Sequence, residues 1–313
     1  MISWLPLALA AGAASGLLNA SGTVGAPLGL MLSHLTLLPL FLSGLGLGVV
    51  AALVSGAVGI GVVAVAAGLG PALVYGGLDA VPVLVLCRQA LLSRKLADGS
   101  VEWYPGGLLL CWLMGIVVAG YLLAVAAFEL FGSGLAEAVG RLVDGMVAAM
   151  GNSLPPEGAK ALVAAVPLIP GIAASYYMVN AIINACLAQY LLRRSGRNLR
   201  PSLAFAELRL PPQLLWVLLA SVVLGMLPTA LAPYAYTLAF IAIVAYFLLG
   251  LAVVHAFLRN RPNRGTALFS FYLMLMLLML LFSAVGFAMA GLGVLEQLVG
   301  LRRRFAGGGK EEE

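Results

Sequence analysis

The chain has 313 residues, of which 63% are hydrophobic and only 9% are charged. A soluble domain carries about 25% charged residues, so this composition excludes a water-soluble globular protein. The net charge of +5 would suit a nucleic-acid partner, but basic residues gathered in the cytoplasmic loops of a membrane protein give the same total. We therefore expect the lipid bilayer as the main partner, and no nucleic acid.

Apolar segments follow one another along the whole chain. They lie at about 3–20, 25–43, 46–68, 71–92, 106–131, 158–192, 212–231, 234–258 and 266–290. A helix needs about 20 residues to cross a hydrocarbon core of about 30 Å. No basic region precedes the first segment, so we expect it to be a retained span rather than a cleaved signal. The pattern predicts an all-α, polytopic transmembrane helical bundle of about eight or nine spans.

The first four segments are rich in glycine and have almost no polar residues between them. Gly12 and Gly16 form one GxxxG pair and Gly44 and Gly48 another, a spacing typical of close packing between membrane helices. The turns between these segments are marked by glycine and proline.

Two ionisable side chains lie within these apolar segments. His34 is near the middle of the second segment and Asp79 near the middle of the fourth. A charged group at the bilayer centre costs at least about 2.5 kcal/mol and usually faces a partner or a cavity. Their similar depth allows a His–Asp pair or a shared polar pocket. The alternatives are a loop or helix-capping position for Asp79 and a hydrogen-bonded packing role for His34.

The stretch from 132 to 157 is acidic, unlike the other connections. Within it, apolar residues recur at helical spacing opposite Glu137, Arg141 and Asp144. This predicts an amphipathic helix at the outer membrane interface. Its apolar face consists of Leu135, Val139, Leu142, Val143, Met146, Val147 and Met150.

The segment at 158–192 contains Pro167 and Pro170, which predict a kink or a break because proline removes a backbone hydrogen bond. Further along, Tyr176, Asn180 and Asn184 are spaced four apart and share one helix face. Such a stripe can line a solute cavity, or it can join helices by interhelical hydrogen bonds.

Three internal loops are basic, which the positive-inside rule places in the cytoplasm. They contain Arg88, Arg94 and Lys95; then Arg193, Arg194, Arg197, Arg200 and Arg209; then Arg259, Arg261 and Arg264. A ninth span would put Arg302, Arg303 and Arg304 outside. Either the chain turns back after about residue 286, or the final stretch lies on the outer interface.

The C-terminal half contains the runs NACLAQYLLRRSG, FAELRLP, GLAVVHAFLR and GVLEQLVGLRRR. In this order they resemble the YybS-like family of bacterial membrane proteins, which has no assigned biochemical function. The family usually has Asp at the position of Glu296 and a basic residue at that of Ala206. The resemblance implies a multi-pass protein of the bacterial cytoplasmic (inner) membrane. It also raises a docking role for His255, with which Glu207, Arg209 and Arg302 can form a cytoplasmic cluster.

The first four segments are also similar to the substrate-binding S components of energy-coupling-factor transporters. This resemblance implies a membrane-embedded pocket for a small-molecule solute and association with other membrane subunits. The chain then divides into an S-component-like bundle (1–131), an external acidic segment (132–157), a YybS-like bundle (158–305) and a disordered tail (306–313).

Three functions follow, in order of preference. The first is small-solute binding or a transport-related role, with His34, Asp79, Tyr176, Asn180 and Asn184 as candidate ligand-binding residues. The second is a non-transporting scaffold or assembly factor, which docks partners through Glu207, Arg209, His255 and Arg302. The third is an intramembrane enzyme. We expect no enzyme, cofactor or metal site, because the sequence has none of the common catalytic motifs and its three cysteines are scattered.

Overall fold

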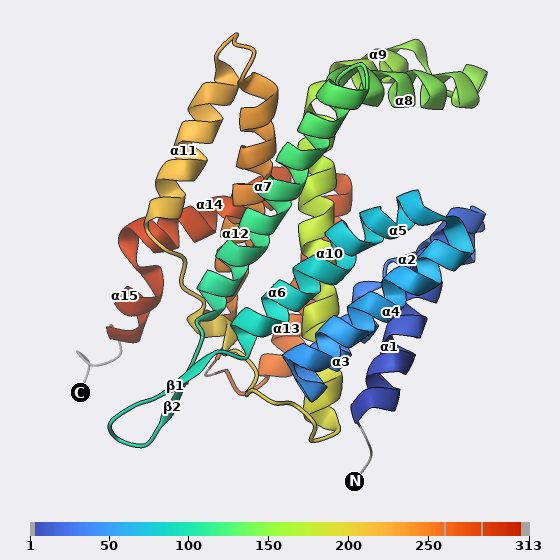
Figure 1. Cartoon of the computed structure of the whole chain (residues 1–313). Helices are drawn as coiled ribbons and strands as arrows, with labels where there is room; N and C mark the ends of the chain where they lie inside the picture. The colour runs from blue at the N-terminus through green and yellow to red at the C-terminus, as the bar shows by residue number, and fades with distance from the viewer. Residues whose placement is uncertain (1–3, 260, 283, 308–313) are drawn as a thin grey trace. The chain divides into compact units, whose positions relative to one another are not determined.

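The computed structural model describes residues 4–259, 261–282 and 284–307. These residues are almost entirely helical (Figure 1), which confirms the all-α fold. In the described part, the strands are β1 (Ser93–Lys95) and β2 (Val101–Trp103), which pair as one antiparallel hairpin. Most of the tail predicted to be disordered, 308–313, lies outside the described residues.

The helices have the following bounds in chain order. The first part of the chain forms α1 (Trp4–Ser21), η1 (Gly22–Val24), α2 (Pro27–Ser33), α3 (Leu37–Leu47), α4 (Val49–Ala67), α5 (Leu69–Tyr75), η2 (Gly76–Ala80), α6 (Val81–Ala90) and α7 (Gly106–Phe131). The remainder forms α8 (Leu135–Met150), η3 (Gly151–Ser153), α9 (Pro156–Ala164), η4 (Val166–Leu168), α10 (Ile169–Arg194), η5 (Phe205–Glu207), α11 (Gln213–Met226), α12 (Ala232–Phe257), α13 (Arg264–Leu281), α14 (Ala284–Val299) and α15 (Leu301–Gly307).

The chain packs as two compact units. Unit 1 contains Met1–Ile116 and Tyr177–Leu203, and unit 2 contains Val117–Tyr176 and Ala204–Glu313. The units are not consecutive in sequence, because α7 and α10 each pass from one unit to the other. The division at 131 and 158 predicted from the sequence follows changes in composition, whereas this one follows packing.

Seven of the described helical segments are long and apolar enough to cross a membrane, fewer than the eight or nine predicted. α1 is not among them, and α11 and α14 are shorter apolar helices. One of the two missing spans is lost where a helix ends inside an apolar run. α11 stops at Met226 because Leu227, which precedes Pro228, is extended, as residues before proline usually are. The run at 266–290 is also divided, between α13, which is one of the seven, and α14.

In unit 1, α1 packs directly against α4 through its glycine pair. A Cβ added to Gly12 would lie 2.3 Å from the carbonyl oxygen of Ser55, and one added to Gly16 would lie 2.7 Å from Cβ of Val62. The first GxxxG pair therefore has the packing role predicted for it. The second pair differs, because Gly48 joins α3 to α4 with a φ of +104°, a conformation that favours glycine.

Two further predictions from sequence concern unit 2. The apolar run at 158–192 is interrupted by η4, which contains Pro167, and α10 begins with Pro170 in its first turn; the predicted break is confirmed. The amphipathic helix is α8, with the bounds expected from its periodicity. Its Val143 is buried, whereas Leu142 and Met146 are at least half exposed, so the helix still presents an apolar face that suits a membrane interface.

The core of unit 2 is α12, against which α11 and α14 pack. α14 approaches α12 at backbone contact: a Cβ on Gly250 would lie 2.0 Å from the carbonyl oxygen of Met289, and one on Gly293 would lie 2.0 Å from that of Tyr246. Beyond this crossing, Arg302 reaches the carbonyl oxygen of Ala206 at 2.6 Å. Of the two alternatives for the C-terminus, the structure therefore favours the one in which the chain turns back.

Arg200, in the loop after α10, contacts two other segments of unit 1. It is only 5% exposed, and its guanidinium donates to the carbonyl oxygens of Ala90 at 2.9 Å and Tyr104 at 3.1 Å. It also lies over the Trp103 ring, 5.8 Å from its centroid. Burial lowers the pKa of Arg200 from its ordinary value. The side chain thus satisfies backbone acceptors where α6 and the hairpin end.

The crossing of α12 and α14 can be tested with a pair of glycines on one helix. We expect Gly293→Ala to lower the free energy of unfolding by roughly 1–3 kcal/mol, because a methyl group would overlap a backbone carbonyl. The matched control is Gly291→Ala, since nothing lies within 4 Å of a Cβ there. Thermal unfolding of the purified proteins in detergent measures both. Equal stability of the two variants would show that the helices do not meet at Gly293.

The role of Arg200 can be tested in the same assay. Arg200→Gln leaves buried carbonyl oxygens without a donor and should cost about 2 kcal/mol. Arg197→Gln removes an exposed guanidinium from the same loop and should change stability by no more than about 0.5 kcal/mol. A loss as large in Arg197→Gln would mean that the overall charge of the loop is what matters.

Candidate functional site

A polar cluster lies among the membrane-spanning helices of unit 1. Ser15 and Asn19 are four residues apart on α1, and Tyr75 and Asp79 are four apart on α5 and η2. The two pairs meet in register: the hydroxyl oxygens of Ser15 and Tyr75 are 2.7 Å apart, and the Asn19 amide donates to Asp79 Oδ2 at 3.2 Å. We call these four residues, with Thr36, the intramembrane polar cluster.

The directions of the hydrogen bonds around Ser15 follow from the number of protons available. The Ser15 hydroxyl donates to the main-chain carbonyl of Thr36 at 2.7 Å. A serine hydroxyl has one proton, so Tyr75 is the donor in its hydrogen bond with Ser15. Gly59 leaves room for that tyrosine, because a Cβ there would lie 2.1 Å from the Tyr75 hydroxyl oxygen. The small residues of α4 therefore place a polar group inside the bundle.

Asp79 lies on η2, a π-helical turn between α5 and α6. Pro82 follows and has no N–H to donate to the carbonyl four residues earlier, that of Leu78. The Tyr177 hydroxyl on α10 donates to this carbonyl oxygen. π-Helical turns inside α-helices occur frequently at functional sites, and this one carries the acid predicted from the sequence.

The surroundings of Asp79 contain a neutral partner rather than a cation. The side chain is half-buried within the membrane-spanning segment Leu69–Ala90. Among the residues that the structure describes, no lysine or arginine lies within ion-pair distance of its carboxylate. Asn19 supplies its hydrogen bond.

Asn184 joins α10 to the turn between α2 and α3. Its amide donates to the carbonyl oxygens of His34 and Asn180, both at 2.9 Å, and lies 3.2 Å from Asn180 Oδ1. Asn184 is 1% exposed, and among the residues that the structure describes its own Oδ1 has no hydrogen-bond partner. Asn184 thus connects α10 to another segment, as one of the two roles predicted for the stripe requires, whereas its bonds to Asn180 lie within α10.

The predicted ligand-binding residues do not all lie in one cluster. Asp79 belongs to the intramembrane polar cluster, and Asn184 contacts His34 through the main-chain carbonyl of that residue. Tyr176 is 54% exposed and belongs to unit 2. Sequence reasoning missed Ser15, Asn19, Tyr75 and Tyr177. A signal was available, because polar residues spaced four apart on both α1 and α5–η2 indicate facing stripes.

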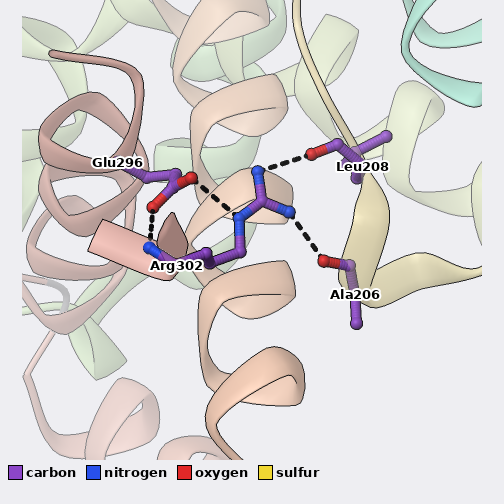
Figure 2. Close-up of polar contacts among 4 residues, drawn as sticks. All are labelled: Ala206, Leu208, Glu296 and Arg302. Carbon is purple, nitrogen blue, oxygen red and sulfur yellow. Dashed lines mark hydrogen bonds and ion pairs between the residues drawn. The ribbon is translucent and has the colours of Figure 1, made fainter. Parts of the chain in front are cut away.

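A second group of polar residues lies in unit 2, around the loop that contains η5. Figure 2 shows its centre, where the Arg302 guanidinium meets Glu296 and the loop. Arg302 Nε donates to Glu296 Oε1 at 2.8 Å, while Nη1 and Nη2 donate to the carbonyl oxygens of Ala206 at 2.6 Å and Leu208 at 2.9 Å. The Arg302 main-chain N–H donates to the other Glu296 oxygen at 2.9 Å.

This ion pair is largely removed from water, since the side chains of Arg302 and Glu296 are 16% and 9% exposed. A buried charge is tolerated only when its partner and its hydrogen bonds are in place. Here both Glu296 oxygens accept hydrogen bonds, and the Arg302 guanidinium connects the η5 loop to Glu296 on α14. Arg302 therefore has a structural role in addition to its charge.

The predicted cluster of Glu207, Arg209, His255 and Arg302 is brought to this loop. Glu207 forms an exposed ion pair with Arg259 at 3.2 Å. The His255 ring packs edge-on against Phe205, with centroids 5.1 Å apart, and its Nε2 lies 2.7 Å from the Tyr272 hydroxyl. His255 thus contacts the loop and α13, and these contacts lie within unit 2.

A cleft of about 930 Å³ opens beside the loop. Glu207, Arg209 and Arg302 line it, whereas His255 does not. Arg259, Glu296 and Arg303 were not predicted as members of the cluster. The other lining residues are Ala206, Leu210, Pro212, Leu249, Ala256, Phe257 and Gln297.

No three His, Cys, Asp or Glu side chains in the described ranges are grouped to hold a metal ion. No curated protein and no solved structure matches the chain significantly. A family of predicted membrane proteins of unknown function, designated DUF2232, matches residues 16–293. Because this match covers most of the chain, the protein belongs to that family, which agrees with its apolar, membrane-spanning helices.

Proposed function

We propose that the protein binds a small solute within the membrane, in a transport-related role, and that Asp79 contacts the solute. The observation that carries this proposal is the Asp79 carboxylate on its π-helical turn, paired with the neutral amide of Asn19. An ionisable residue inside a membrane segment is costly and is usually functional. A purely structural role would be filled at lower cost by a neutral side chain.

The chemistry of the cluster indicates what kind of solute it would take. An ionised carboxylate only accepts hydrogen bonds. Outside the intramembrane polar cluster, the buried Oδ1 of Asn184 is a second acceptor, and none of the described residues donates to it. Both belong to unit 1, where Tyr177 and Asn184 connect α10 to η2 and to the turn before α3. A solute that offers an N–H group or a positive charge would suit the Asp79 carboxylate.

The scaffold hypothesis draws less support. Of the residues assigned to docking, Arg302 is bound to Glu296 and two main-chain carbonyls, and His255 contacts Phe205 and Tyr272. These side chains already serve the packing of unit 2. We therefore favour solute binding.

The proposal is tested by a thermal-shift screen of the purified protein against vitamins, nucleosides and metal ions. A ligand present at 100 times its Kd stabilises a protein by about 2.7 kcal/mol. We expect a stabilising solute for the unmodified protein and loss of that stabilisation in Asp79→Asn. This variant keeps the size of the side chain and an oxygen that can accept from Asn19.

The matched control is Asp144→Asn, which removes an exposed carboxylate on α8. It should retain the full ligand-dependent shift. If Asp79→Asn were stabilised by the same solute as strongly as the control, Asp79 would not contact the solute.

A further inference from the structure

The cleft beside η5 in unit 2 is not used by the proposed intramembrane site, and its walls carry a surplus of positive charge. Four arginines line it, Arg209, Arg259, Arg302 and Arg303, against two carboxylates, Glu207 and Glu296. Its volume of about 930 Å³ falls in the range of about 300–1,000 Å³ that is typical of small-molecule sites.

The charges within this cleft are not all paired. Glu296 is bound to Arg302, and Glu207 to Arg259. Arg209 and Arg303 are exposed, and no carboxylate of the described residues lies within ion-pair distance of either. The net positive charge of the cleft therefore rests on these two guanidinium groups.

The loop that carries Arg209 is fixed in place. Arg302 binds the carbonyl oxygens on either side of Glu207, and Gln297 donates to the carbonyl oxygen of Pro211 at 3.2 Å. Contacts at both Leu208 and Pro211 thus hold the main chain around Arg209 before any ligand arrives. A pre-ordered loop reduces the entropy that binding costs.

The cleft has an apolar wall formed mainly by Phe257 of α12, which is 45% exposed, and by the exposed Pro212. Leu249 and Leu210 also line the cleft but are buried, with 2% and 8% exposed. α12 is one of the helices able to cross a membrane, so the cleft combines a cationic rim with a wall that continues along a membrane-spanning helix.

From this combination, we propose that the cleft binds a phosphate ester through Arg209 and Arg303. Guanidinium groups form paired, charge-assisted hydrogen bonds with phosphate oxygens. The phosphate can come from the headgroup of an anionic phospholipid, whose chains the apolar wall would accept, or from a soluble phosphorylated compound. This site is independent of the solute site at Asp79, which lies in unit 1.

The test uses the full-length protein in nanodiscs of phosphatidylcholine. Phosphatidylglycerol is added in steps in one arm, and glycerol 3-phosphate in the other, with binding followed by native mass spectrometry and by thermal shift. We expect the double variant R209Q/R303Q to bind at least roughly tenfold more weakly, as two lost charge-assisted contacts imply. Both side chains are exposed, and size-exclusion chromatography verifies that the variant folds.

The charge-matched control is R193Q/R197Q, which removes two exposed arginines of unit 1 that do not line the cleft. Binding of phosphatidylglycerol alone, lost only in R209Q/R303Q, supports the proposal with a lipid as the source. Binding of glycerol 3-phosphate with the same loss supports it with a soluble source. Absence of binding in both arms, or equal weakening in the two double variants, would overturn the proposal.

Discussion

The constraint on which this structure depends is that a hydrocarbon interior has no water to satisfy a backbone carbonyl. At two of the positions where an apolar helical run is interrupted, a side chain from another segment supplies a donor. Tyr177 donates to Leu78 at the π-helical turn, and Ser15 donates to Thr36 after α2. Outside the apolar segments, Arg302 likewise donates to two carbonyl oxygens of the η5 loop. These contacts connect segments far apart in sequence, so the irregular positions fix the packing.

Close approach of the helices is the second requirement, because dispersion between backbones replaces much of the hydrophobic driving force in lipid. Gly12 lets α1 reach α4, and Gly293 lets α14 reach α12. At Gly59 the absence of a side chain leaves room for the Tyr75 hydroxyl, and thus for the intramembrane polar cluster. Small residues therefore determine where polar groups can enter the bundle as well as how helices cross.

The two candidate sites differ in how far they could be predicted. Asp79 could be identified from the sequence because a carboxylate inside a long apolar segment is unusual. Its partner Asn19 could only be suspected, because its spacing of four from Ser15 matches that of Tyr75 and Asp79, but spacing alone does not say which two helix faces meet. In unit 2, the resemblance in the C-terminal half drew attention to Glu296 and Arg302. Their pairing across a loop at 2.8 Å depends on the backbone path through Gly300, whose φ is +66°.

The sequence by itself determined the membrane setting, the helical fold, the breaks at Pro167 and Pro170 and the amphipathic α8. These depend on composition, periodicity and local backbone chemistry, which neighbouring residues specify. Only the tertiary structure decided that Asp79 faces α1 and that Arg302 contacts the η5 loop. It also decided that α7 and α10 each contribute residues to both units. The physical reason is that apolar helices have many equivalent faces in lipid. Which faces meet depends on small residues and single hydrogen bonds that gain meaning only across the chain.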